Sequence, residues 1–129
     1  MIEHCHGQGM DPHYFGYFDY FNRGLFYEAH DVLEQLWLAD RNSPDYAFYK
    51  GLIQLAGAFV HLQKGRLRPA AALFKLAHAN FANYPEKYQR LDIEQLQALI
   101  ARWLALLEEG GFALNPLSPG QHPKITLLS

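Results

Sequence analysis

Residues Phe21 to Trp37 read FNRGLFYEAHDVLEQLW, and this stretch indicates both a helical fold and a polar site. Asn22-Arg23-Gly24 is a typical end of one helix, because glycine adopts the left-handed conformation that stops it. The next helix should run from Leu25 to Ala39. Apolar residues recur along it at helical spacing and form one stripe, which comprises Phe26, Ala29, Leu33, Leu36 and Trp37. A histidine and several carboxylates lie within or beside that stripe.

Capping signals and apolar periodicity predict four further helices along the chain. Asp11-Pro12 and Ser43-Pro44 each combine a capping side chain with a proline at the first helical position. Asp92 is followed three residues later by Gln95, which has the form of a capping box. Together with the helix described above, we expect helices over residues 12–22, 25–39, 44–63, 69–84 and 93–109. The fold class is therefore all-α, with about five antiparallel helices in a bundle or a short superhelix of helix hairpins.

The length of 129 residues fits one domain, which we place at residues 1–111. Residues 112–129 contain three prolines and are predicted to form an extended C-terminal tail. Ile125, Leu127 and Leu128 make this tail apolar enough to dock on a groove of this chain or of a partner.

Composition excludes several classes of protein. A net charge of -2 with scattered basic residues gives no electrostatic reason to bind nucleic acid. The longest strongly apolar segment, Gly51 to Leu62, would span about 18 Å as a helix, against roughly 30 Å for the hydrocarbon core of a membrane. The single cysteine, Cys5, excludes an internal disulfide, and the first residues lack the apolar run of a signal peptide. We therefore expect a cytoplasmic protein without a membrane partner.

Two lines of polar residues are predicted to face each other. At about 100° per residue, His30 lies beside the apolar stripe of its helix, and Glu34 follows one turn later. On the next helix Lys50, Gln54 and His61 lie on one line. Buried amides and imidazoles cost roughly 1 to 3 kcal/mol when they have no hydrogen-bond partner, so the two lines are expected to meet.

Such a cluster allows a chemical and a structural interpretation. In the first, His30, Glu34 and His61 bind a divalent metal that activates water, and Glu28 or Asp31 acts as general base of a hydrolase. The surrounding pocket would be lined by Tyr27, Trp37, Lys50 and Gln54. In the second, a neutral histidine satisfied by a carboxylate and a glutamine holds two helices together. We favour the second, because one His-x-x-x-Glu pair is a much weaker signature than His-Glu-x-x-His.

The motif also carries a family resemblance. The segment from Phe21 to Trp37, followed by Tyr49-Lys50-Gly51-Leu52-Ile53-Gln54, His61 and Gly65, resembles a family of small bacterial and archaeal helical proteins known as DUF309. The resemblance covers roughly residues 14–85. It implies a helical array and a site at His30-x-x-x-Glu34-x-x-Trp37, but no activity. Asp31 stands where that family often has glutamate.

Two functional hypotheses follow. The first is a pocket protein that takes a small molecule, with metal-dependent hydrolysis as its catalytic version. It requires His30, Glu34, Gln54 and His61 to converge. The second is a noncatalytic interaction module, in which paired helices present a groove to a peptide or to a second copy in a homodimer.

Overall fold

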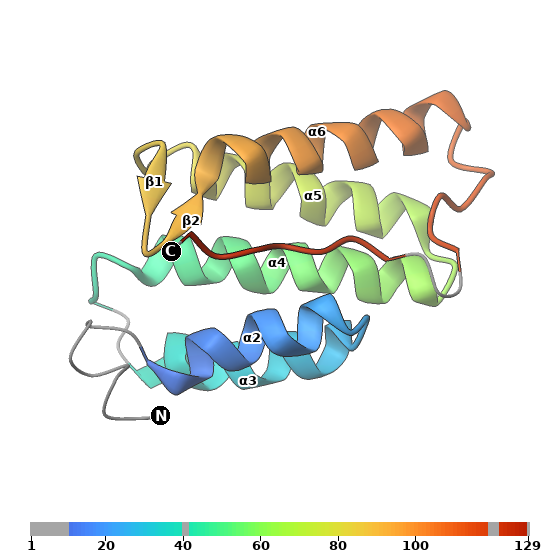
Figure 1. Ribbon diagram of the computed structural model, residues 1–129. Helices are drawn as coiled ribbons and strands as arrows, with labels where there is room; N and C mark the ends of the chain where they lie inside the picture. The colour runs from blue at the N-terminus through green and yellow to red at the C-terminus, as the bar shows by residue number, and fades with distance from the viewer. Residues whose placement is uncertain (1–10, 40–41, 119–121, 129) are drawn as a thin grey trace.

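The described chain folds into helices joined by short turns (Figure 1). The computed structural model describes residues 11–39, 42–118 and 122–128. In these residues the helices are α2 (Pro12–Asn22), α3 (Phe26–Ala39), α4 (Tyr46–Gln63), α5 (Leu67–Phe81) and α6 (Ile93–Glu109). Two short strands, β1 (Lys87–Tyr88) and β2 (Leu91–Asp92), precede α6. The expected all-α class is confirmed. Cys5 lies outside the described residues.

Short-range signals explain three of the helix ends as predicted. The carboxylate of Asp11 accepts a hydrogen bond from the backbone N–H of His13 at 2.8 Å, which caps α2. Asp92 caps α6 by accepting from the backbone N–H of Gln95 at 3.0 Å. After α2, Gly24 has a φ of +77°, which costs glycine little and other residues more.

Three predicted helix bounds need correction. The hydroxyl of Ser43 accepts a hydrogen bond from the backbone N–H of Asp45, within a turn. Helix α4 therefore begins only at Tyr46. Helix α5 begins at Leu67 rather than at Pro69, because proline is tolerated anywhere in a first turn whose N–H groups have no helical partner. The same helix ends at Phe81, before the predicted residue 84.

A small hairpin between α5 and α6 was not predicted. Strands β1 and β2 are antiparallel, with Tyr88 opposite Leu91. The two turn residues, Gln89 and Arg90, have φ values of 47° and 60°, the left-handed pair that a tight hairpin turn requires. Strands of two residues are too short to show alternation in a sequence.

The order of packing follows the order of the chain. Helix α2 packs on α3, α3 on α4, α4 on α5 and α5 on α6. Helix α4 lies in the middle of this array, with α2 and α3 on one side and α5 and α6 on the other (Figure 1). It buries the largest set of side chains, among them Phe48, Leu52, Leu55, Phe59 and Leu62. No helix in the described parts of the chain combines the length and apolarity needed to cross a membrane.

Tyrosines of α2 use their hydroxyls to tie this helix to distant segments. Tyr17 donates to the backbone carbonyl of Leu52 at 2.6 Å, and Tyr14 donates to that of Gln89 at 2.7 Å. Burial raises the pKa of both phenols, so both remain protonated donors. Helix α2 is thereby attached to α4 and to the hairpin.

Residues 122–128 run as an extended segment along α4, between α2 and α6 (Figure 1). The side-chain amide of Asn22 donates to the carbonyl of Ile125 at 2.8 Å and accepts from its N–H at 2.7 Å. The N–H of Leu128 donates to the backbone carbonyl of Arg90, and the side-chain Nε of Arg90 donates to the carbonyl of Leu128, both at 2.7 Å. The side chain of Ile125 is buried in the core. Of the two predicted docking surfaces, a groove of this chain is therefore the one observed.

Candidate functional site

A cavity of about 300 Å³ lies where α3, α4 and α5 meet. It brings together three of the four residues that were expected to converge, namely His30, Gln54 and His61. Helix α4 supplies most of the lining, at positions that recur every three or four residues and so share one face. The complete lining consists of Tyr27, His30, Ile53, Gln54, Gly57, Val60, His61, Lys64 and Leu73.

The two imidazoles are the most unusual groups of this cavity. The Nδ1 atoms of His30 and His61 are both buried, and neither has a hydrogen-bond partner among the described residues. The ring of His30 stacks on that of Tyr27, with 6.3 Å between centroids and 20° between planes. A buried ring nitrogen without a partner costs free energy, and here two histidines that each hold such a nitrogen line one cavity.

A residue on α5 orients the side-chain amide of Gln54. Its Oε1 accepts a hydrogen bond from the side-chain amide of Asn80, on α5, at 2.7 Å. Because the oxygen is engaged in this way, the Nε2 group is the part of Gln54 that remains to donate to a ligand. Gln54 therefore meets a partner on α5, whereas the sequence predicted one on α3.

The electrostatic surroundings favour the neutral form of His61. Burial lowers the pKa of His61 below its usual 6.5, and the positive charges of Arg66 and Lys64 lower it further. Lys64 is exposed and Tyr27 is 61% exposed, so both belong to the rim of the cavity. The site is therefore rich in hydrogen-bond donors, and its lining contains no carboxylate.

Glu34 does not line this cavity, contrary to prediction. Helices α3 and α4 run antiparallel (Figure 1). One turn beyond His30, Glu34 therefore lies toward the start of α4, away from His61 near its end. Within the described residues, no group of three or more His, Cys, Asp or Glu side chains is placed to hold a metal ion. The predicted three-ligand site of His30, Glu34 and His61 is thus not formed.

The remaining predicted site residues lie elsewhere. Glu28 and Asp31 are exposed on α3 and do not line the cavity, and the same holds for Lys50 on α4. Trp37 stacks on Tyr46, with 5.1 Å between ring centroids, and is likewise not part of the lining. Of the expected pocket residues, Tyr27 and Gln54 are the two that the cavity contains.

Sequence reasoning missed the apolar wall of the cavity. This wall consists of Ile53, Val60 and Leu73, and Lys64 lies at its rim. Ile53, Gly57, Val60 and Lys64 follow one another at steps of four, three and four residues. This line runs beside the predicted polar line on α4, and it was the available signal.

Comparison with known proteins identifies relatives but no activity. The model of a family described as "Domain of unknown function (DUF309)" matches residues 14–73, which confirms the resemblance over a shorter range than 14–85. A protein of Aquifex aeolicus (strain VF5), described as "Uncharacterized protein", is 30% identical over 89 residues. That alignment covers 69% of this chain and 27% of the Aquifex protein. No solved structure matches the chain.

Proposed function

We propose that the cavity between α3, α4 and α5 binds a small organic carboxylate. The chain is similar to the DUF309 family, whose function is unknown, over residues 14–73, so the function is inferred from the site itself. One observation carries this proposal. The Nδ1 atoms of His30 and His61 are buried and lack a hydrogen-bond partner among the described residues, and both histidines line the same cavity. A ligand that satisfies both nitrogens recovers the free energy that the fold loses there.

The chemistry of the lining favours an acid over a neutral or basic ligand. A neutral imidazole can present an N–H, and the Gln54 amide and the Tyr27 hydroxyl add further donors. Lys64 contributes a positive charge at the rim. The opposite wall, of Ile53, Val60 and Leu73, is apolar and suits a hydrocarbon body. An aromatic or branched carboxylate of benzoate size combines both properties.

Binding explains this cavity better than hydrolysis does. The hydrolase hypothesis requires a carboxylate as general base or metal ligand beside the imidazoles. The lining contains neither aspartate nor glutamate, and the described residues form no three-ligand metal group. The two imidazoles and an amide can still orient and hold an anion through charge-assisted hydrogen bonds.

The proposal can be tested with the ring signals of the histidines. We would titrate the labelled full chain with sodium benzoate and follow the imidazole resonances by NMR, with benzamide as the uncharged match. We expect benzoate to shift the signals of His30 and His61 saturably, and benzamide to leave them in place. His78, which is exposed on α5, and His122 serve as internal controls. Equal shifts of all four histidines, or none, would contradict the proposal.

Substitution separates ligand binding from a purely structural role. If His30 and His61 are retained for a ligand, His30→Leu and His61→Leu should abolish benzoate binding and leave stability equal or higher, because an unpaired buried nitrogen is removed. If the imidazoles hold the helices together, the same variants should lose stability. His78→Leu is the matched control. Urea unfolding and benzoate titration of the three variants distinguish the two roles.

A further inference from the structure

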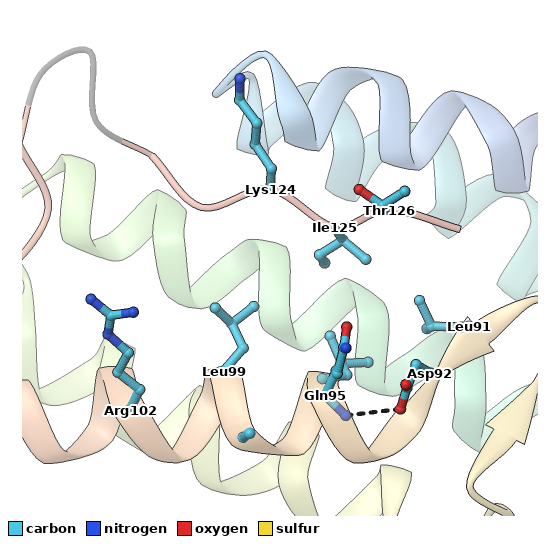
Figure 2. A pocket seen from close by; sticks show the side chains of 10 residues that line it. Leu91, Asp92, Gln95, Leu99, Arg102, Lys124, Ile125 and Thr126 are labelled. Atoms are coloured by element: carbon cyan, nitrogen blue, oxygen red, sulfur yellow. Dashed lines mark hydrogen bonds between the residues drawn. The ribbon is translucent and has the colours of Figure 1, made fainter. Parts of the chain in front are cut away.

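A second concave surface is formed by residues that come later in the sequence than those that line the histidine cavity. It is a groove of about 390 Å³ between α6 and the C-terminal segment 122–128, and Figure 2 shows it from close by. The groove shares no lining residue with the histidine cavity. Its lining consists of Leu91, Asp92, Gln95, Leu96, Ala98, Leu99, Arg102, Lys124, Ile125 and Thr126.

The base of this groove is apolar. Leu91, Leu96 and Ile125 are buried in the protein core, and Leu99 is half-buried on the side of α6 that faces the tail. In Figure 2, Leu99 extends from α6 toward the tail, and Ile125 extends from the tail into the same space. A hydrocarbon chain placed there would lose contact with water on both sides.

The tail forms a fixed wall of the groove rather than filling it. Asn22 engages both backbone groups of Ile125, at 2.7 and 2.8 Å, on the side of α2. In an extended chain, the N–H and C=O groups of neighbouring residues point to opposite sides. The backbone groups of Lys124 and Thr126 therefore face α6. Neither residue makes a backbone hydrogen bond to any described part of the chain.

One end of the groove carries a positive charge. Arg102 lies one turn beyond Leu99 on the same face of α6, is exposed, and makes no hydrogen bond or ion pair with a described residue. Figure 2 shows its guanidinium directed toward the tail, whereas the side chain of Lys124 points away from α6. At the other end, Asp92 is engaged in capping α6. The charge of the groove is thus asymmetric along its length.

From this arrangement we propose that the groove is a second binding site, specific for a carboxylate with a linear apolar chain. The carboxylate pairs with Arg102, which can bind it through two parallel N–H donors. The hydrocarbon chain lies over Leu99 and Leu96 toward Leu91, and the tail backbone at Thr126 borders it. The site takes an elongated amphipathic acid, whereas the histidine cavity takes a short one.

Site-resolved titration with sodium octanoate tests this proposal. In methyl and amide NMR spectra of the full chain, we expect saturable shifts at the Leu99 and Ile125 methyl groups and at the Thr126 amide. Arg102→Gln should weaken octanoate binding about fivefold, as expected for loss of one exposed charge-assisted contact. Octan-1-ol should bind weakly and equally to both proteins. Lys75→Gln is the matched control, because Lys75 is exposed on α5 and does not line the groove, and it should change affinity less than about twofold.

A blocking variant completes the design. Leu99→Trp should fill the groove and abolish the octanoate shifts, while its amide spectrum reports whether the fold is retained. The proposal is overturned if octanoate causes no saturable shift at the groove, or if Arg102→Gln leaves affinity unchanged. Shifts confined to the rings of His30 and His61 would also overturn it, because they would assign octanoate to the other cavity. A failure of benzoate to bind at those histidines leaves the present site unaffected.

Discussion

At the scale of single residues, Gly51 on α4 is required for the close approach of α5. A Cβ atom at this position would lie 2.9 Å from Cε1 of Phe81 and 3.3 Å from Cβ of Asn80. Phe81 is fully buried, and Asn80 precedes it in α5. Neither residue can move without disturbing the packed atoms around it. We expect Gly51→Ala to lower the free energy of unfolding by about 1 to 3 kcal/mol, measured by urea denaturation.

The matched control for this variant is Gly16, within α2. A Cβ atom there would lie 3.7 Å from the nearest atom of Val32, which is ordinary van der Waals contact. Alanine also loses less backbone entropy than glycine on folding, so Gly16→Ala should raise stability by about 0.5 to 1 kcal/mol. If Gly51→Ala were as stable as Gly16→Ala, the close packing of α4 against α5 would be wrong.

Protonation of His61 should couple stability to pH. Burial and two nearby cations lower the pKa of His61 in the folded protein, so the unfolded chain binds a proton more readily. Stability therefore rises with pH in the interval below the unfolded value of 6.5, and falls as the pH is lowered through it. We expect acidification from about pH 7.5 to about pH 5.5 to reduce the free energy of unfolding more in the wild type than in His61→Leu.

Urea unfolding of both proteins at each pH provides the measurement. Other groups titrate in both proteins alike, so the comparison isolates His61. If the difference in free energy of unfolding between the two proteins is constant across this interval, His61 binds protons equally in the folded and unfolded states, and the prediction is wrong.

The sequence allowed part of the site to be predicted at this scale. Helical spacing predicted that Gln54 and His61 share a face of α4 and that this face meets His30, and all three line one cavity. The error at Glu34 has a geometric origin. A helical wheel describes direction around an axis, but the position along the axis depends on how the partner helix is aligned, which no local pattern encodes.

At the scale of elements, the docking of the C-terminal segment depends on the side-chain amide of Asn22. Asn22→Asp keeps an oxygen for the N–H of Ile125 but places a second oxygen against its carbonyl, where the native amide donates at 2.8 Å. We expect amide exchange at Ile125 and Leu128 to accelerate about tenfold, since a lost hydrogen bond costs roughly 1 to 2 kcal/mol.

Hydrogen exchange with residue resolution measures this effect and locates it. Amides within α4 and α5 should keep their protection, because they do not depend on the tail. Asn83→Asp is a suitable control, since among the described residues the side-chain amide of Asn83 bonds only to carbonyls of its own turn, those of Ala79 and Asn80. Unchanged exchange at Ile125 in Asn22→Asp would mean that the tail is held by burial of its side chain alone.

Elements with local signals were predicted well, and elements held by distant contacts were not. The starts of α2 and α6 follow from Asp11 and Asp92, whose carboxylates cap the helices as expected. The hairpin before α6 and the path of the tail have no comparable signal. The partner of Ile125 is Asn22, at the other end of the chain, and nothing near either residue identifies the pair.

At the scale of the whole molecule, the two proposed binding sites lie on different sides of the central helix α4. One of its faces lines the histidine cavity together with α3 and α5. The tail runs along it elsewhere and borders the second groove with α6 (Figure 1). Because the two sites have no lining residue in common, a ligand in one does not displace a ligand in the other.

Independent sites make a quantitative prediction about stability. A ligand that binds only the folded protein raises the free energy of unfolding by about 2.7 kcal/mol at a free concentration of about 100 Kd. With benzoate and octanoate both at that level, urea denaturation should show a gain close to the sum of the two separate gains. A combined gain no larger than the greater single gain would indicate one shared site. A combined gain that lies above the greater single gain but differs clearly from the sum would indicate coupling through α4. The variant His61→Leu, which removes only the benzoate contribution, distinguishes these cases.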